Sequence, residues 1–257
     1  MNTKFYKIQC ITNLYVGSGD INYSIVDNQV EKDAVTGLPV IHASGIKGAL
    51  RDVVEKENNE LAKKIFGSKG QQDQTNEGSH KFFDALLLAR PMRVSGSDRT
   101  ASILVTTLAA LNLFIERINL LNCNTYGINP IAEIDFAGNA FLTNSKEKIL
   151  IEGDATGLLP EAIEKELLKI KNIIGDTFAI AASFDGYDLP VVARNRLENK
   201  KSENLWYEEV VPHGSVLYFA VISPDDDVDC AKLTIPEIVQ FGGHSTIGCG
   251  FTKVTSI

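Results

Sequence analysis

The sequence predicts an α+β fold in which helices cover one side of an antiparallel sheet. Segments typical of strands and of helices alternate along the chain, but they do not form regular strand–helix pairs. No repeat of fixed period appears, which argues against a solenoid. With 257 residues, of which 44% are hydrophobic, the chain can bury a core of its own, and we expect one domain, residues 1–257, with insertions.

The N-terminal quarter is predicted to hold extended segments followed by one helix. Aromatic and β-branched residues at 5–14 indicate a strand that ends at a glycine turn, and a second extended piece follows at 25–30. Residues 40–41 are expected to form a short buried strand. Ser44 can then cap a helix that covers residues 45–65.

The middle of the chain combines a loop, a strand and a helix. Residues 68–80 are polar and contain glycine, which is typical of a mobile loop. An apolar run at 82–88 predicts a central strand that Pro91 ends. Leucines and isoleucines at three- and four-residue spacings then predict an amphipathic helix over 102–121.

The C-terminal half is predicted to contain one more helix and two strands. The helix covers residues 159–174, with a proline near its first turn and a glycine just past its end. Residues 177–204 show no periodicity. Strands are expected at 216–223 and 251–254, and the acidic run at 225–229 is expected to lie in a solvated loop.

Composition limits the classes of function. A formal charge of −8 and a pI near 5.1 argue against a protein that coats nucleic acid with a uniformly basic surface, so only a local basic track could bind RNA. No stretch is long and apolar enough to span a bilayer, and the N-terminus lacks a signal-peptide pattern, so we expect a cytoplasmic protein with no membrane partner. The cysteines are far apart and are expected to be reduced; they are Cys10, Cys123, Cys230 and Cys249.

One candidate basic track lies at the start of the predicted helix at 45–65. Free backbone N–H groups at a helix N-terminus, with Lys47 beside them, suit a phosphate group, and Arg51 lies one turn further on. The sequence has no P-loop motif. The alternative is that Gly45 and Gly48 only permit close packing of the helix on the sheet, and from the residues alone both interpretations stand.

Two other features are candidates for contact with a ligand. The glycine-rich segment 241–251 could track a phosphodiester backbone, or it could be only a tight turn before the last strand. Asp27 lies among polar and glycine residues, where a carboxylate can meet a ligand and hold Mg²⁺ together with substrate phosphates. Its alternative role is to stabilise a turn.

Four separated blocks resemble one known family. They are TNLYVGSGDINYSIVDNQVEKDAVTGLPVIHASGIKGALR, FFDALLLARPMR, NLWYEEVVPHGSVLYFAVI and QFGGHSTIGCGF. In this order they are similar to the RAMP superfamily, and specifically to the repeated backbone subunit of type III-B CRISPR (Cmr) effector complexes. The type III-A backbone subunit shares the V-D-N block and the T-G-L-P turn; the LWYEE block favours III-B.

This resemblance implies a ferredoxin-like (RRM-type) antiparallel sheet core with three insertions: a loop at about 68–80, a helical segment at 97–122 and a thumb-like hairpin at 177–204. Copies of such a subunit stack head-to-tail along a guide RNA beside other Cmr subunits. Each copy cleaves complementary target RNA, so cuts fall at regular intervals. The alternatives are a scaffold that binds guide RNA without cutting, and an unrelated enzyme that binds a phosphate ligand.

The resemblance also implies roles for individual residues. Asp27 is the expected cleavage residue, acting with the target 2′-hydroxyl, and the expected ligand of a divalent metal ion, Mg²⁺ or Mn²⁺. The expected RNA-binding residues are Ser44, Lys47, Arg51, Arg93, Gly242, Gly243, Thr246, Gly248 and Gly250. The chain departs from the family pattern where Ala43 replaces a glycine and Gly45 replaces a serine. Trp206 and Tyr207 could stack on bases, although such residues more often belong to a core.

Overall fold

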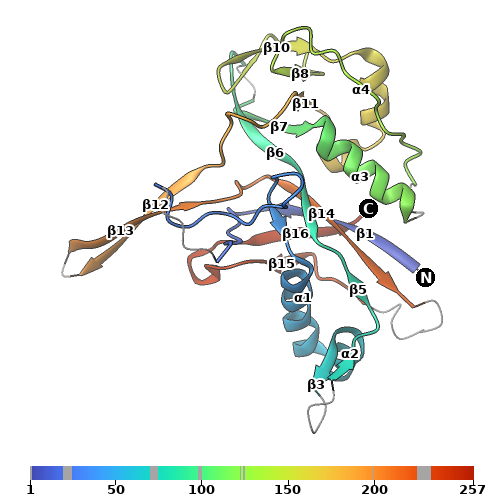
Figure 1. The fold of residues 1–257 in the computed structure, drawn as a ribbon, viewed down its shortest axis with the longest axis vertical. Helices are drawn as coiled ribbons and strands as arrows, with labels where there is room; N and C mark the ends of the chain where they lie inside the picture. The colour runs from blue at the N-terminus through green and yellow to red at the C-terminus, as the bar shows by residue number, and fades with distance from the viewer. Residues whose placement is uncertain are drawn as a thin grey trace.

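The computed structural model describes residues 2–19, 25–69, 75–97, 100–121, 123, 125–198, 200–224 and 233–257. An open sheet forms the centre of the molecule, and a small closed barrel lies beyond one end of it (Figure 1). One long strand, β6 (Ala85–Ser95), belongs to both. The acidic run at 225–229, and residues 70–74 of the predicted polar loop, lie outside the described residues.

The open sheet has the strand order β15-β16-β1-β14-β6, and every pair in it is antiparallel. Two short strands extend it, β2 against β6 and β5 against β14. Besides β6, its strands are β15 (Ile238–Gln240), β16 (Phe251–Ser256), β1 (Asn2–Cys10), β14 (Val216–Ser223), β2 (Val40–Ile41) and β5 (Lys81–Phe82). The prediction of the strands at 40–41 and 216–223 is confirmed.

The barrel closes because β6 pairs with two different strands, so that six strands form the ring β6-β7-β11-β8-β10-β9. Two of its pairs, β7 with β11 and β8 with β10, are parallel, so the predicted purely antiparallel sheet is wrong for this part. The strands other than β6 are β7 (Ser102–Thr107), β11 (Phe178–Ala181), β8 (Phe141–Thr143), β10 (Asp154–Leu158) and β9 (Leu150–Ile151).

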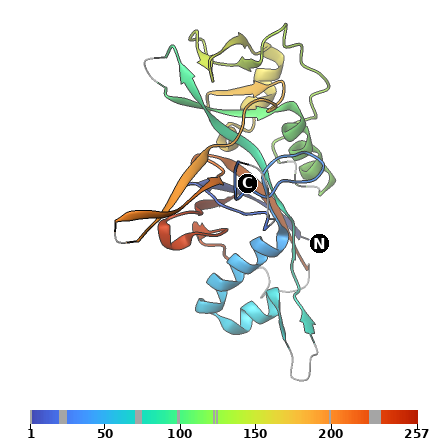
Figure 2. The same cartoon turned by 60° about the vertical axis from the view of Figure 1, so that its left-hand side comes forward.

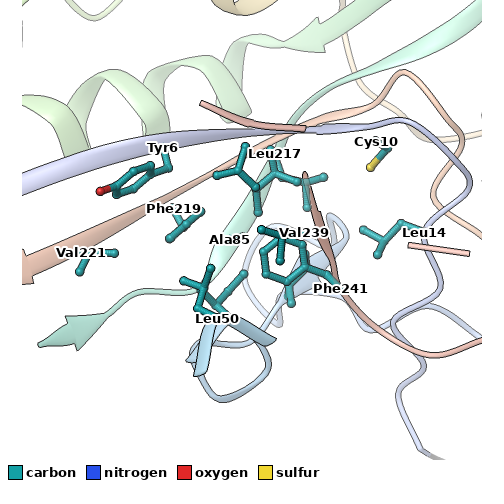
Figure 3. Close-up of a cluster of buried hydrophobic side chains, with 14 of the residues drawn as sticks. Tyr6, Cys10, Leu14, Leu50, Ala85, Leu217, Phe219, Val221, Val239 and Phe241 are labelled. Atoms are coloured by element: carbon teal, nitrogen blue, oxygen red, sulfur yellow. The ribbon is translucent and has the colours of Figure 1, made fainter. Parts of the chain in front are cut away.

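Helices cover both faces of the open sheet, which corrects the prediction that they cover one. Alternate residues of β14 point to opposite faces: Leu217 and Phe219 pack in one core with Leu50, whereas Tyr218 packs in the other with Phe114. Figure 3 shows the first core, between β1, β14 and the helix that carries Leu50. Both faces of β14 are apolar, so both require cover. The first face is covered by α1 (Ala43–Glu57) and α2 (Asn59–Phe66). The second core includes α3 (Leu108–Leu120) and α5 (Lys171–Ile174), and it continues to α4 (Glu161–Leu168) beside the barrel.

The predicted helix over 45–65 is two helices. Asn58 adopts an extended conformation between them, and its side-chain oxygen accepts a hydrogen bond from the N–H of Leu61 at 3.0 Å, which caps α2. The helix over 159–174 is likewise interrupted between α4 and α5. Ser44 does not cap α1, because the residue at the cap is His42.

Three further element predictions were wrong for identifiable reasons. The predicted helix over 102–121 begins only at Leu108, because the β-branched residues before it form β7 and Thr107 caps the helix by accepting from the N–H of Ala110 at 3.2 Å. The predicted loop at 68–80 contains the hairpin strands β3 (Gly67–Lys69) and β4 (Thr75–Glu77). Residues 25–30 form a loop with isolated bridges.

Pro91 does not end its strand, since β6 continues to Ser95. The N–H of Arg93 points away from β7, toward a side-chain oxygen of Glu152, and the nitrogen of Pro91 points to the same side because the backbone repeats every two residues. On that side of β6, the pairing with β14 extends only as far as Ala89, and the pairing with β9 starts at Val94. Pro91 therefore lies where the strand changes partner and no ladder hydrogen bond is lost.

A separate two-stranded hairpin projects from the body of the molecule (Figures 1 and 2). Its strands are β12 (Val191–Glu198) and β13 (Lys201–Glu209), joined in antiparallel register. The hairpin begins later and ends later than the segment 177–204, whose first residues form β11 of the barrel.

Among the described residues, no helix is long and apolar enough to cross a membrane. Three cysteines, Cys10, Cys123 and Cys249, are free thiols, and Cys230 lies outside the described residues. Burial raises the pKa of the Cys10 thiol to about 12. The thiol therefore stays protonated and acts as a small apolar group in the first core.

We predict that Leu217→Ala lowers the free energy of unfolding by about 2–5 kcal/mol, because it removes a fully buried side chain and leaves a cavity in the first core. Leu120→Ala is the matched control, since Leu120 is 80% exposed and its truncation should change stability by less than about 0.5 kcal/mol. Denaturant unfolding of the two variants measures both values. Equal stabilities would contradict the assigned core.

Candidate functional site

Asp27 is exposed and lies at the base of the β12–β13 hairpin. Its Oδ2 atom accepts a hydrogen bond from the backbone N–H of Tyr207 on β13 at 2.8 Å. The next residue, Asn28, donates its N–H to the carbonyl of Tyr207 and accepts the N–H of Glu209 through its own carbonyl. These bonds fix the segment 25–30, which we call the acid loop, along the edge of β13.

The last residue of β13 reinforces this attachment. Glu209 is buried, and one of its oxygens accepts the N–H of Val30 at 3.0 Å while the other contacts the ammonium of Lys32 at 3.0 Å. Its carboxylate is therefore neutralised and fully used in holding the end of the acid loop. The hydrogen bond to Asp27 leaves the second oxygen of Asp27, Oδ1, without a hydrogen-bond partner among the described residues.

A second carboxylate, Glu208, is buried in the same place. Its Oε2 accepts a bond from Nε of Arg194 on β12 at 2.9 Å, and its Oε1 accepts one from the indole N–H of Trp206 at 2.7 Å. Two further nitrogens lie 3.4 Å from Oε1: Nδ2 of Asn28 in the acid loop, and Nε2 of His244, which is not aligned for a hydrogen bond. We call these five residues the Glu208 network.

Burial by itself raises the pKa of Glu208, but the hydrogen bonds from Trp206 and Arg194, together with the nearby His244, outweigh it and lower the pKa. The carboxylate is thus charged at neutral pH. Burial by itself lowers the pKa of Arg194, but its hydrogen bonds to Glu208 and, through Nη2, to the sulfur of Cys249 at 3.6 Å outweigh it and raise the pKa.

The C-terminal glycine segment lies against this network. Gly242 and Gly250 have positive φ, and a side chain at either would collide with a backbone carbonyl, that of Tyr15 for Gly242 and that of Phe241 for Gly250. Close backbone packing therefore requires glycine at both positions, and RNA contact there stays a prediction. Space is open at Gly248, and Thr246 is exposed on the outside of the same turn.

His244 joins this turn to the N-terminal glycine segment. Its φ of 60° is left-handed, an uncommon conformation for a residue with a side chain. Its ring lies 4.6 Å from the ring of Tyr15, and the N–H of Gly243 donates to the carbonyl of Tyr15 at 2.9 Å. In both ribbon views the red segment that follows β15 lies between the hairpin and α1 (Figures 1 and 2).

The helix α1 brings three predicted RNA-binding residues together. Ser44, Lys47 and Arg51 fall within about 60° of each other around a helix of 3.6 residues per turn, and all three line one open hollow of about 620 Å³. Lys81 of β5 lines the hollow from the other side, a residue that the sequence analysis missed. Glu77 also lines the hollow and Arg51 pairs with Glu55 at 3.3 Å, but among the described residues Lys47 and Lys81 have no carboxylate partner, so the hollow keeps a positive charge.

The N-terminal backbone of α1 is less available than the sequence suggested. The N–H of Ala43 donates to Oδ1 of Asp84 at 2.6 Å, and the N–H of Gly45 bonds to the carbonyl of His42. A carboxylate of the protein thus accepts one of the N–H groups that were expected to meet a phosphate, and a second is used within the turn. Asp84 is 41 residues away in sequence, so its role could not be foreseen.

Arg93 lies apart from the other candidates. It is on the barrel end of β6, where it is exposed and its guanidinium lies 3.5 Å from Glu152. Trp206 is half-buried and Tyr207 is exposed, so the alternative that placed them in a core is wrong.

Among the described residues, no group of three acidic, histidine or cysteine side chains could hold a metal ion. Asp27 alone could supply one ligand, through Oδ1, and the others would have to come from RNA and water.

The residues of the Glu208 network other than Trp206 were missed entirely. In L-W-Y-E-E, the alternation of a strand places Trp206 and Glu208 on one side and Tyr207 on the other, which could have indicated an inward-facing acid. The partners, however, are 14 to 180 residues distant in sequence from Glu208, and only the fold brings them together.

Comparison with known proteins gives consistent matches over nearly the whole chain. The curated relatives include the CRISPR system Cmr endoribonuclease Cmr4 of Pyrococcus furiosus, which is 27% identical over 95% of this chain and 92% of its own. The CRISPR system CMR subunit Cmr4 of Saccharolobus solfataricus is also 27% identical, over 98% of this chain and 95% of its own.

Solved structures show the same fold. A chain of the type III-B Cmr-beta complex in the apo state matches with a TM-score of 0.78 at 21% identity, covering 99% of this chain and 97% of its own. The Cmr-beta complex bound to cognate target RNA gives 0.77 at 23% identity, covering 100% and 97%. Oligomeric Cmr4 from Pyrococcus furiosus gives 0.71 at 21% identity, covering 100% and 98%. The family model described as the RAMP superfamily matches residues 7–253, and this chain therefore belongs to the RAMP superfamily.

Proposed function

We propose that this protein is the repeated backbone subunit of a type III-B CRISPR effector complex, and that it is an RNA-guided endoribonuclease. It binds guide RNA as a head-to-tail filament with other Cmr subunits and cuts complementary target RNA at regular intervals in the cytoplasm. Support comes from the relatives, which are named as a Cmr endoribonuclease and a CMR subunit and match this chain almost end to end. Their names favour type III-B over type III-A.

The observation that carries the proposal is the position of Asp27. A carboxylate that cleaves RNA must be accessible and held in a defined place, and Asp27 is exposed while its Oδ2 is fixed to the base of the projecting hairpin. The hairpin is the part of the chain best shaped to enter a guide–target duplex (Figure 2). A hairpin that displaces one target nucleotide would bring the adjacent phosphodiester to Asp27.

RNA carries its own nucleophile, the 2′-hydroxyl, so the protein needs mainly to orient that group in line with phosphorus. Asp27 would accept the 2′ proton or hold the ribose, and a 2′,3′-cyclic phosphate would remain on the upstream product. A divalent ion, Mg²⁺ or Mn²⁺, held by Asp27 and target phosphate oxygens, would stabilise charge on the phosphoryl group. DNA lacks the 2′-hydroxyl and would not be cut.

Guide RNA would lie along the hollow of α1. Lys47 and Arg51 supply positive charge there, and Ser44 and Lys81 extend the surface. Thr246 and the open backbone at Gly248 would support the guide from the C-terminal turn. The net charge of −8 over the whole chain would limit adsorption of unrelated RNA elsewhere on the surface. We assign Arg93 a guide contact only through the family resemblance.

We further propose that the open sheet is the ferredoxin-like core and that the whole chain is one RAMP domain. Supporting this is the order β16-β1-β14-β6, in which β1 and β6 run parallel on either side of β14 and α1 lies between them in sequence. The barrel and the β12–β13 hairpin would then be insertions between the second and third core strands.

We predict that Asp27→Asn lowers target cleavage by about 10²–10⁴-fold in the reconstituted complex and leaves target affinity unchanged. The amide oxygen of asparagine still accepts the N–H of Tyr207, so the acid loop stays attached while the charge is lost. Cleavage should also stop in EDTA and return with Mg²⁺. Gel analysis of labelled target RNA measures both effects.

Glu31→Gln is the matched control, because Glu31 lies four residues away and, within the described part of the chain, its carboxylate pairs with His42 alone, at 3.3 Å. It should cut at the normal rate. Full activity of Asp27→Asn would overturn the assignment of the site and leave a guide-binding scaffold. Tight binding of nucleotides without any binding of guide RNA would favour the unrelated enzyme.

We predict that Lys47→Gln weakens guide RNA binding and reduces the slope of log affinity against log salt by about 0.7, the value of one phosphate contact on a single strand. Lys56→Gln is the control, since Lys56 lies on the same helix about 180° away from Lys47. Titration of guide RNA at several salt concentrations gives both slopes. Identical slopes for the two variants would remove Lys47 from the RNA track.

A further inference from the structure

The Glu208 network joins three segments that are far apart in sequence. Arg194, Trp206 and Glu208 belong to the base of the hairpin, Asn28 belongs to the acid loop, and His244 belongs to the C-terminal glycine turn. Glu208 is only 1% exposed, and among the described residues its carboxylate contacts nitrogen atoms of these three segments. A single carboxylate therefore connects the proposed guide side of the molecule with the proposed cleavage side.

Such an arrangement differs from an ordinary surface ion pair. Burying a carboxylate is unfavourable unless hydrogen bonds and opposite charges compensate for the lost water. The same hairpin also carries an exposed pair, Arg196 with Glu203 at 3.4 Å, where Arg196 and Glu203 are both accessible and contribute little. The buried network lies at the end of the hairpin that contacts the acid loop, whereas the exposed pair lies toward the tip.

The network also surrounds the group that holds Asp27. Trp206 and Glu208 flank Tyr207 in sequence, and their side chains are hydrogen-bonded to one another. The peptide N–H of Tyr207, between them, is the donor to Asp27 at 2.8 Å. Asn28, the residue after Asp27, lies against the same carboxylate. Glu208 thus contacts a neighbour of each partner in the bond that fixes Asp27: Trp206, next to Tyr207, and Asn28, next to Asp27.

We propose that Glu208 is a positioning residue for target RNA cleavage. It sets the orientation of Asp27 and links the acid loop to the C-terminal glycine turn. A guide RNA bound to that turn would therefore keep a fixed position relative to Asp27. Glu208 does not touch RNA in this proposal. The inference rests on the proposed nuclease function, and it adds a residue whose loss affects the rate of cleavage without affecting recognition of the target.

The test uses the complete reconstituted complex with guide and complementary target RNA. Glu208→Gln keeps the size of the side chain, but an amide has one acceptor oxygen and cannot accept from both Arg194 and Trp206 in the present geometry. We expect the single-turnover rate at saturating target to fall about 10–10²-fold, as a displacement of about 1 Å can cause. Target affinity should stay within about twofold, and the interval between cuts should not change.

Two variants keep the result interpretable. Glu203→Gln alters the exposed pair on the same hairpin and should cut at the normal rate. Trp206→Phe removes one donor to Glu208 without changing charge, and it should give a smaller loss of rate than Glu208→Gln. If the Glu208→Gln complex does not assemble, the rate of Trp206→Phe decides the question.

A normal saturated rate for both network variants would overturn the proposal. The proposal would also be overturned if the variants bound target more weakly or cut at a different interval while the rate at saturating target stayed normal. That result would indicate a misfolded hairpin. Asp27→Asn in the same assay separates this failure from that of the nuclease function. If Asp27→Asn is inactive and Glu208→Gln is fully active, the nuclease function holds and only the positioning role is lost.

Discussion

The attachment of the acid loop to β13 is the constraint on which the proposed chemistry depends. Residues 25–30 contain no regular element, and their position comes from hydrogen bonds to the hairpin: two backbone bonds at Asn28, one from Tyr207 to Asp27 and one from Val30 to Glu209. A loop without such bonds would populate many conformations, and ordering it during the reaction would cost about 1–2 kcal/mol for each residue. In this protein the loop is already ordered by folding, so RNA binding does not have to order it.

The scaffold behind the loop is rigid because one strand serves two sheets. β6 carries the open sheet on its first half and closes the barrel on its second, with Pro91 at the change of partner. Both faces of β14 are buried, against α1 on one side and α3 on the other. The hairpin leaves the barrel side and returns into β14, so both of its ends are tied to packed strands. Because both ends of the hairpin are fixed, its base holds a defined position relative to the packed strands.

Sequence patterns predicted the elements whose conformation depends on neighbouring residues. They failed for elements whose conformation depends on partners distant in sequence. The strand at 216–223 was predicted correctly because its apolar run has a single interpretation, whereas residues 102–107 were taken for helix because leucine and isoleucine spacing continued smoothly into α3. Pro91 was misread because only the arrangement of neighbouring strands shows that its missing N–H has no ladder partner. In the site, the residues alone made Asp27, Lys47 and Arg51 candidates and the family resemblance supplied their expected roles, while Glu208 and Asp84 act through residues that no local pattern connects to them.

Three carboxylates meet at the base of the hairpin, and their environments separate their roles. Glu208 is neutralised by Arg194 and lies near His244, and Glu209 is neutralised by Lys32. Asp27, among the described residues, has no cation within ion-pair distance and is the exposed member of the three. Two uncompensated acids beside it would repel the phosphates of an approaching RNA strand. Pairing Glu208 and Glu209 internally leaves Asp27 as the one free negative charge of the three, and in the proposed function a single carboxylate can bind Mg²⁺ together with phosphate oxygens and water.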